Sequence, residues 1–185
     1  VPLGSVDLNN VRNAADVSDQ GTNIHLANFP VKANHSPDAI TFQRIAGKSY
    51  MLTANEGDYR EYAALTEEVR VSALKLDSAK FPEQGLLKSG NVLGRLSVSS
   101  KQGDLDNDGD IDEIYINGSR GFSIWDAASG AMVYHSGSDF ERYTATDAAW
   151  KPFFNASNNV GAPSLKNRSD NKGPEPEGVV TAVIN

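Results

Sequence analysis

Five aspartates occupy alternate positions in one short segment, and this spacing predicts a cation-binding loop. Residues 103–113 read Gly-Asp-Leu-Asp-Asn-Asp-Gly-Asp-Ile-Asp-Glu. Calcium takes about six to eight oxygen ligands, several of them carboxylates, from a loop that can wrap round the ion. Gly109 permits the sharp turn that such a loop needs. The predicted calcium ligands are Asp104, Asp106, Asp108, Asp110 (by its backbone carbonyl) and Asp112.

The loop at 104–113 is of calcium type without being an EF-hand. The position where an EF-hand carries its bidentate glutamate is Tyr115, and the residues that follow favour a strand. The loop resembles the short aspartate-rich loops between strands of integrin-type propellers. The alternative is a solvated acidic turn, which would leave the aspartates repelling one another, so calcium is the favoured interpretation.

Two further groups of acidic residues adjoin predicted strands. Glu56 and Asp58 follow one strand, and Glu177 precedes another. In a propeller the loops at strand ends converge on one face, where carboxylates could hold a metal that activates water. These three are the catalytic candidates. The alternative, which the polar composition of the turns favours, is that they hydrogen-bond loop backbones.

Three arginines are candidate ligand-binding residues, because a guanidinium can bind phosphate through two hydrogen bonds. They are Arg60, Arg70 and Arg120. Pairing with a neighbouring aspartate or glutamate is the commoner role. The three histidines are scattered without the spacing of a zinc site, and the chain has no Gly-x-Ser-x-Gly or phosphate-loop motif.

The amino-acid composition limits the kinds of ligand and partner that the chain is expected to bind. The formal net charge is −7, which disfavours nucleic acid and anionic lipid but suits cations. There are no cysteines, so disulfides and thiolate metal sites are excluded. No apolar run is long enough to span a membrane. Residues 1–5 are interpreted as a protease-site remnant and 6–185 as one domain.

The elements that must position these residues are strands. Residues 38–45 and 49–54 flank a short glycine-containing connection and predict a hairpin, and residues 68–76 predict another strand. Residues 112–117, 122–126 and 131–136 predict a three-stranded antiparallel meander of propeller-blade type. The expected packing residues are Ile114, Ile116, Phe122, Ile124, Trp125 and Val133.

The C-terminal third is predicted to be different. Residues 139–177 read as a long polar loop, and 179–184 as a strand. Three blade-sized units are fewer than the roughly four to eight of a closed propeller. We therefore expect an all-β, incomplete propeller, with 179–184 as an edge strand paired on one side only or covered by another molecule. The remainder would come from the same polypeptide or a second fragment.

Several segments together resemble the choice-of-anchor I family of exported bacterial proteins, related to alkaline phosphatase-like and esterase-like phytase propellers. The matching segments are 37–40, 53–60, 67–71, 108–113, 121–126 and 170–179. The resemblance implies a β-propeller that is secreted or attached at the cell surface. We expect a calcium-binding module for binding or scaffolding. The alternative is a metal-dependent phosphoesterase that uses Glu56, Asp58 and Glu177.

Overall fold

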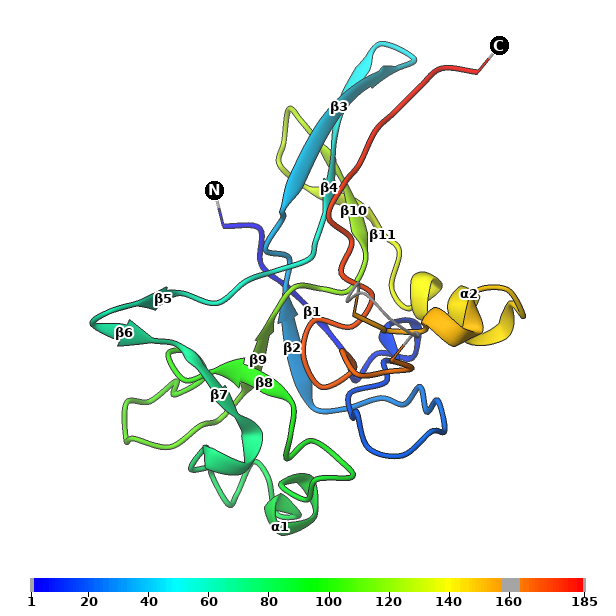
Figure 1. The fold of residues 1–185 in the computed structure, drawn as a ribbon. Helices are drawn as coiled ribbons and strands as arrows, with labels where there is room; N and C mark the ends of the chain where they lie inside the picture. Colours follow the sequence, from blue (N-terminus) through cyan, green and yellow to red (C-terminus); the bar gives the residue numbers. More distant parts are fainter. Residues whose placement is uncertain (1, 158–163, 185) are drawn as a thin grey trace.

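The computed structural model describes residues 2–157 and 164–184 and shows a mainly β chain with few, short helices (Figure 1). The strands are β1 (Ser5–Asp7), β2 (Val31–Asn34), β3 (Ala39–Ile45), β4 (Lys48–Ala54), β5 (Glu61–Tyr62), β6 (Leu65–Thr66), β7 (Glu68–Arg70), β8 (Ser97–Ser99), β9 (Ile114–Asn117), β10 (Phe122–Asp126) and β11 (Met132–His135). The helices are α1 (Gln84–Leu87) and α2 (Asp139–Thr146), with 3₁₀ turns η1 (Val11–Asn13), η2 (Val71–Ala73) and η3 (Lys151–Phe153). No described helix is long and apolar enough to cross a bilayer.

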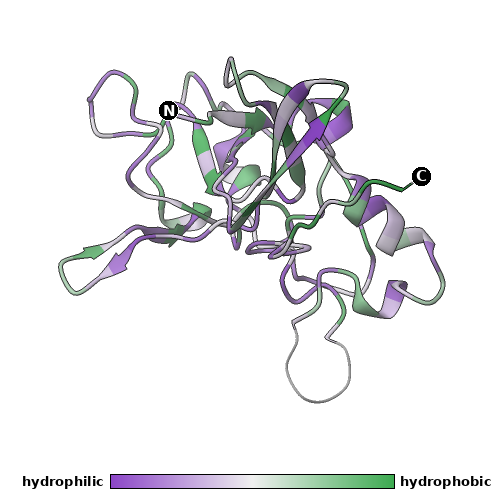
Figure 2. Ribbon diagram, turned by 90° about the horizontal axis from the view of Figure 1, so that it is seen from above, coloured by the Kyte–Doolittle hydropathy of each residue, from purple (hydrophilic) through white to green (hydrophobic). Residues whose placement is uncertain are grey.

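One part of the molecule, here called the body, holds the hydrophobic core. Its main sheet has the order β1-β2-β9, with β1 antiparallel and β9 parallel to β2. Alternate residues of β2 and β9 point inward, so Val31, Ala33, Ile114 and Ile116 are buried. The β7–β8 pair and the α1 region close this core, to which Leu96 also belongs. Figure 2 shows hydrophobic stretches, drawn in green, on several strands of the ribbon.

The second part, here called the arm, is an antiparallel sheet of order β11-β10-β4-β3 that projects from the body (Figure 1). Its hairpin β3–β4 turns through Ala46 and Gly47, both with positive φ. A two-residue loop of this kind matches the twist of the flanking strands. At the other hairpin, the Asp126 carboxylate accepts hydrogen bonds from the backbone of Ala128 and Ser129 and fixes the β10–β11 turn. The predicted hairpin at 38–54 is confirmed.

The predicted three-stranded meander is wrong in one respect. β10 and β11 form a hairpin, but β9 pairs in parallel with β2, and β10 pairs with β4 instead. The chain changes sheets between Asn117 and Phe122, where Gly118 and Arg120 have positive φ. These left-handed residues turn the backbone out of the line that would bring β9 alongside β10.

Other local expectations also change. The strand expected over 68–76 ends at Arg70 and continues as η2, while Leu76 makes only an isolated bridge to Ile111. The segment 139–177 is not a continuous loop, because it contains α2 and η3. Residues 158–163 of that segment lie outside the described residues. Gly4 and Ser5 belong to the fold: the Gly4 carbonyl accepts a hydrogen bond from His35, and Ser5 pairs with Asn34.

The segment 179–184 forms no strand over its described length. It runs extended beside the arm, where the Thr181 hydroxyl lies 3.5 Å from the Phe42 carbonyl (Figure 1). The predicted edge-strand pairing is therefore absent from the described residues. Of the six expected packing residues, Ile114, Ile116 and Trp125 are buried, Phe122 and Ile124 are half-buried, and Val133 is 57% exposed.

Candidate functional site

The aspartate-rich loop folds into a compact carboxylate cluster. One carboxylate oxygen each from Asp104, Asp106 and Asp108 lie within 4.8 Å of one another. Asn107 and Gly109 have positive φ, which reverses the chain. The backbone amide of Gly109 donates to Asp104 Oδ2 at 3.1 Å, and this bond turns the first carboxylate inward. Asp104 Oδ1 is buried and accepts no hydrogen bond from the described residues.

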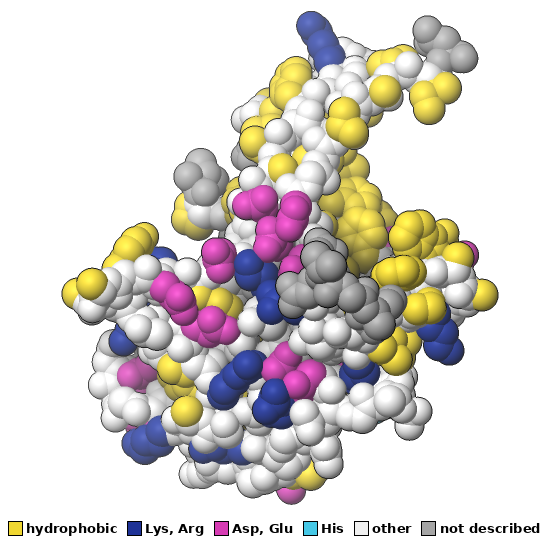
Figure 3. Space-filling view, viewed as in Figure 1, with side chains coloured by type: hydrophobic (Ala, Val, Ile, Leu, Met, Phe, Trp, Pro, Cys, Tyr) yellow, Lys and Arg dark blue, Asp and Glu magenta, His cyan; other side chains and the backbone are white. Residues whose placement is uncertain are grey.

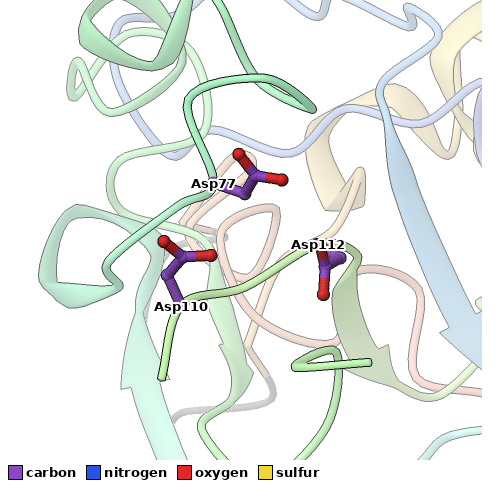
Figure 4. Close-up of side chains that lie close together, drawn as sticks. All are labelled: Asp77, Asp110 and Asp112. Atoms are coloured by element: carbon purple, nitrogen blue, oxygen red, sulfur yellow. The ribbon is translucent and has the colours of Figure 1, made fainter. Parts of the chain in front are cut away.

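The remaining two aspartates belong to a second cluster. Asp110 and Asp112 approach Asp77, again with oxygens within 4.8 Å (Figure 4). Asp77 is placed by two backbone hydrogen bonds, from its own amide to the Ile111 carbonyl and from the Ile111 amide to the Lys75 carbonyl. The structure thus divides the five predicted ligands into two groups. Asp77 was missed because its sequence neighbours carry no metal-site pattern.

The second cluster is partly neutralised from within the chain. Lys75 Nζ lies 3.4 Å from Asp110 Oδ2, and Asp112 Oδ2 accepts a hydrogen bond from the Leu105 amide at 2.8 Å. Desolvation raises the pKa of Asp110, the Lys75 contact lowers it, and the neighbouring charges of Asp108 and Asp77 raise it again; the net direction is upward. Through its hydrogen bond from the Leu105 amide, the Asp112 carboxylate holds the start of the aspartate-rich loop in place.

The two N-terminal catalytic candidates meet a lysine. Lys172 Nζ lies 2.8 Å from Glu56 Oε1 and 3.4 Å from Asp58 Oδ1, at a pocket of about 280 Å³. The backbone at Gly57 lies so close to the backbone at Gly118 that a Cβ on Gly57 would lie only 2.0 Å from the Gly118 nitrogen. Sequence reasoning missed Lys172, which lies far along the chain. Glu177 lines a different pocket, so the structure does not gather the three candidates together.

Each candidate arginine is engaged by acidic or carbonyl groups. Arg60 pairs with Glu67 and Arg70 with Asp170, both at 2.8 Å. Arg120 is 3% exposed and pairs with Glu141 at 3.1 Å. Its guanidinium also donates to the carbonyls of Asp16, Ser169 and Asn171. These contacts match the pairing alternative and make Arg120 a clamp between the N-terminal and C-terminal segments.

Two histidines lie where the arm meets the body, in a buried polar cluster here called the joint. Its members are His35, Asn55, Ser119, Ser123 and His135. The Ser123 hydroxyl lies 3.1 Å from His35 Nδ1 and 3.2 Å from His135 Nδ1. Burial, with the nearby His135 as a smaller cause, lowers the pKa of His35 to about 4. Burial also lowers the pKa of His135.

The proton positions of the joint follow from its acceptors. His135 Nδ1 lies 3.1 Å from the Phe122 carbonyl, which can only accept, so this nitrogen carries the proton. Asn55 Nδ2 donates to the hydroxyls of Ser119 and Ser123, which leaves the Ser123 proton for His35 Nδ1. Because its Nδ1 accepts a hydrogen bond, the His35 ring is neutral, and the hydrogen bonds of the joint hold the two parts together.

Comparison with known proteins is consistent with this β architecture. Gigasin-3a of Magallana gigas is 38% identical over 94 residues, which cover 49% of this chain and 32% of that protein. The chain thus spans about a third of the length of this relative. No solved structure matches the chain. The family's name associates it with exported, surface-attached proteins. The choice-of-anchor I domain matches residues 1–185, and the chain therefore belongs to the choice-of-anchor I family.

Proposed function

We propose that this chain is a calcium-binding module of a surface-associated β-propeller protein and acts in binding or scaffolding. The observation that carries the proposal is the first carboxylate cluster, Asp104, Asp106 and Asp108, with the buried Asp104 Oδ1 lacking a partner among the described residues. A buried, unpaired carboxylate oxygen is costly. A calcium ion supplies the missing positive charge and relieves the repulsion among the three side chains.

Calcium would act here mainly as a structural clip. The loop connects the Leu76–Ile111 bridge with β9, whose Ile114 and Ile116 are buried in the body. An ion that binds only the folded state raises the free energy of unfolding by about 2.7 kcal/mol at 100 times its dissociation constant. For a chain of this length that corresponds to a rise in Tm of roughly 5 to 10 °C.

The test is thermal unfolding with calcium and with EGTA. The wild type should melt higher in calcium, and Asp108→Ala should reduce the difference. Glu83→Gln serves as the matched control, because Glu83 is exposed and its side chain makes no capping hydrogen bond. A Tm that responds to neither EGTA nor Asp108→Ala would contradict the proposal.

The propeller part of the proposal is supported by the arm. It is a four-stranded antiparallel sheet, which is the form of a propeller blade. Apolar side chains occur on both of its faces, with Phe42 and Met51 on one and Leu52 and Ile124 on the other. Strands that are buried on both faces carry apolar residues at successive positions. The partner would be further sheets of the same polypeptide or of a second fragment.

The phosphoesterase alternative gains no support from the geometry. Lys172 supplies the positive charge beside Glu56 and Asp58 that a metal would otherwise supply. Turnover of a generic phosphomonoester in the presence of calcium would revive it, provided that Glu56→Gln abolishes that turnover and Glu83→Gln does not.

A further inference from the structure

A second oxygen-lined pocket lies between the helical segment and the C-terminal segment, far in sequence from the aspartate loop. Its volume is about 210 Å³, and its lining comes from α2, from the end of η3 and the residues just after it, and from the segment that carries Glu175 and Glu177. The polar side chains at the pocket are Thr144, Asn155, Glu175 and Glu177. All four carry oxygen, and two carry a carboxylate.

Asn155 provides a fixed, unused acceptor. Its side-chain nitrogen Nδ2 donates to Glu141 Oε1 at 2.7 Å and to Ser169 Oγ at 3.1 Å. Reversing the amide would place its oxygen against the Glu141 carboxylate, so the assignment of oxygen and nitrogen is determined. Asn155 is 3% exposed, and its Oδ1 accepts no hydrogen bond from the described residues. Asn155 lines the pocket, and Oδ1 is the atom of its amide that has no partner among the described residues.

The charges at the pocket favour a cation. Glu175 is paired with Arg168, whereas Glu177 is exposed and forms an ion pair with no described lysine or arginine. The Thr144 hydroxyl donates to the Phe140 carbonyl at 2.8 Å, which leaves its lone pairs available. An amide carbonyl, a hydroxyl and two carboxylates are ligands for a hard divalent cation.

We propose that this pocket binds one divalent cation of the calcium class, held by Asn155 Oδ1, Thr144 Oγ1 and the carboxylates of Glu175 and Glu177. Water molecules complete the coordination of the ion. The site is independent of the 104–112 loop, and its ligands come from three separate segments. Its cation therefore fixes the C-terminal segment against α2. It also gives Glu177 a metal-binding role without a catalytic one.

The experiment separates the two sites by disabling the first. The variant Asp106→Ala/Asp108→Ala removes two loop carboxylates and should still bind one calcium ion by isothermal titration. In that background Glu177→Gln should weaken binding by about tenfold or more, since ligand charge sets affinity at such sites. Thr144→Val should weaken it less. Glu83→Gln in the same background is the control and should leave the affinity unchanged.

Terbium luminescence gives a second measurement. Trp150 packs against Phe153, which lines the pocket, with ring centroids 6.3 Å apart. Light absorbed by tryptophan should therefore sensitise terbium in the loop-disabled variant, and calcium should reverse the signal. If that variant binds no ion, or binds one with an affinity unaffected by Glu177→Gln, the proposal is overturned and Asn155 Oδ1 is left to bind a water molecule. Equal Tm values in EGTA would show that the variants fold alike.

Discussion

The body and the arm are built from the same kind of strand but bury their apolar residues differently. In the body, Leu93, Leu96 and Ile116 are at most 1% exposed. In the arm, Ile40, Phe42 and Ile45 are more than half exposed, as is Val133 on its other outer strand. Figure 3 shows hydrophobic side chains along the projecting arm and the C-terminal segment. The apolar residues of the body are buried in its own core, whereas those of the arm are exposed on a sheet that could pack against another surface.

The largest effect should come from breaking the buried clamp of the body. Arg120→Met leaves the Glu141 carboxylate and several carbonyls buried without their donor. Loss of one partner from a buried ion pair costs about 3 to 5 kcal/mol, and we expect that fall in the free energy of unfolding by urea denaturation. Arg44→Met, at the exposed tip of the arm, is the control. Equal losses of stability in Arg120→Met and Arg44→Met would show that the buried contacts of Arg120 do not stabilise the fold.

Truncating an apolar side chain should destabilise the protein much more in the body than in the arm. Leu96→Ala removes a fully buried side chain and should lower the free energy of unfolding by about 2 to 5 kcal/mol. Ile40→Ala removes a side chain that is 65% exposed and should cost no more than about 0.5 kcal/mol. Chemical denaturation of the two variants measures the difference. A costly Ile40→Ala would mean that the arm already has a cover in solution.

Acid should loosen the joint between the two parts. Because the folded state lowers the pKa of His35 from 6.5 to about 4, it binds fewer protons than the unfolded state within this interval. The free energy of unfolding should therefore fall as the pH drops through 6.5 and continue to fall toward 4. The limit is about 1.4 kcal/mol per pH unit for one group. His35→Asn should reduce this slope, and an unchanged slope would exclude the joint as its source.

The smallest effect on stability is expected at the face of the arm. Phe42 is 57% exposed, so Phe42→Thr, which keeps a strand-forming residue, should change the free energy of unfolding by less than about 0.5 kcal/mol. Self-association at high concentration, measured by light scattering, should fall. Where another sheet covers Phe42, the same substitution should cost about 2 kcal/mol or more.

Local features of this fold were predictable from sequence, and distant pairings were not. The β3–β4 hairpin was predicted because its strands and its Ala46-Gly47 turn are adjacent. The partner of β9 was not, because β2 lies far upstream and parallel pairing leaves no turn signal. α2 was missed because its two turns carry several residues of weak helix propensity.

In the candidate site, too, the local features were predictable from the sequence and the distant contacts were not. The alternating aspartates identified a carboxylate cluster, because spacing within one loop is a local property. Nothing near Asp77, Lys172 or Asn155 indicated their neighbours, since tertiary folding alone brings these residues to Asp110, Glu56 and Glu177. Contacts between distant segments depend on the whole arrangement of strands and loops.

The construction of the arm from two separate hairpins sets the order of events when the chain folds. β3–β4 and β10–β11 are each local and should form within microseconds. They can join only when β4 meets β10, which pairs Ala54 with Phe122 across all of the intervening chain, including most of the core. Closing so long a loop is slow, because its loss of entropy is offset by contacts only once the body has formed. The arm sheet should therefore be completed in the rate-limiting step of folding, after both of its hairpins already exist.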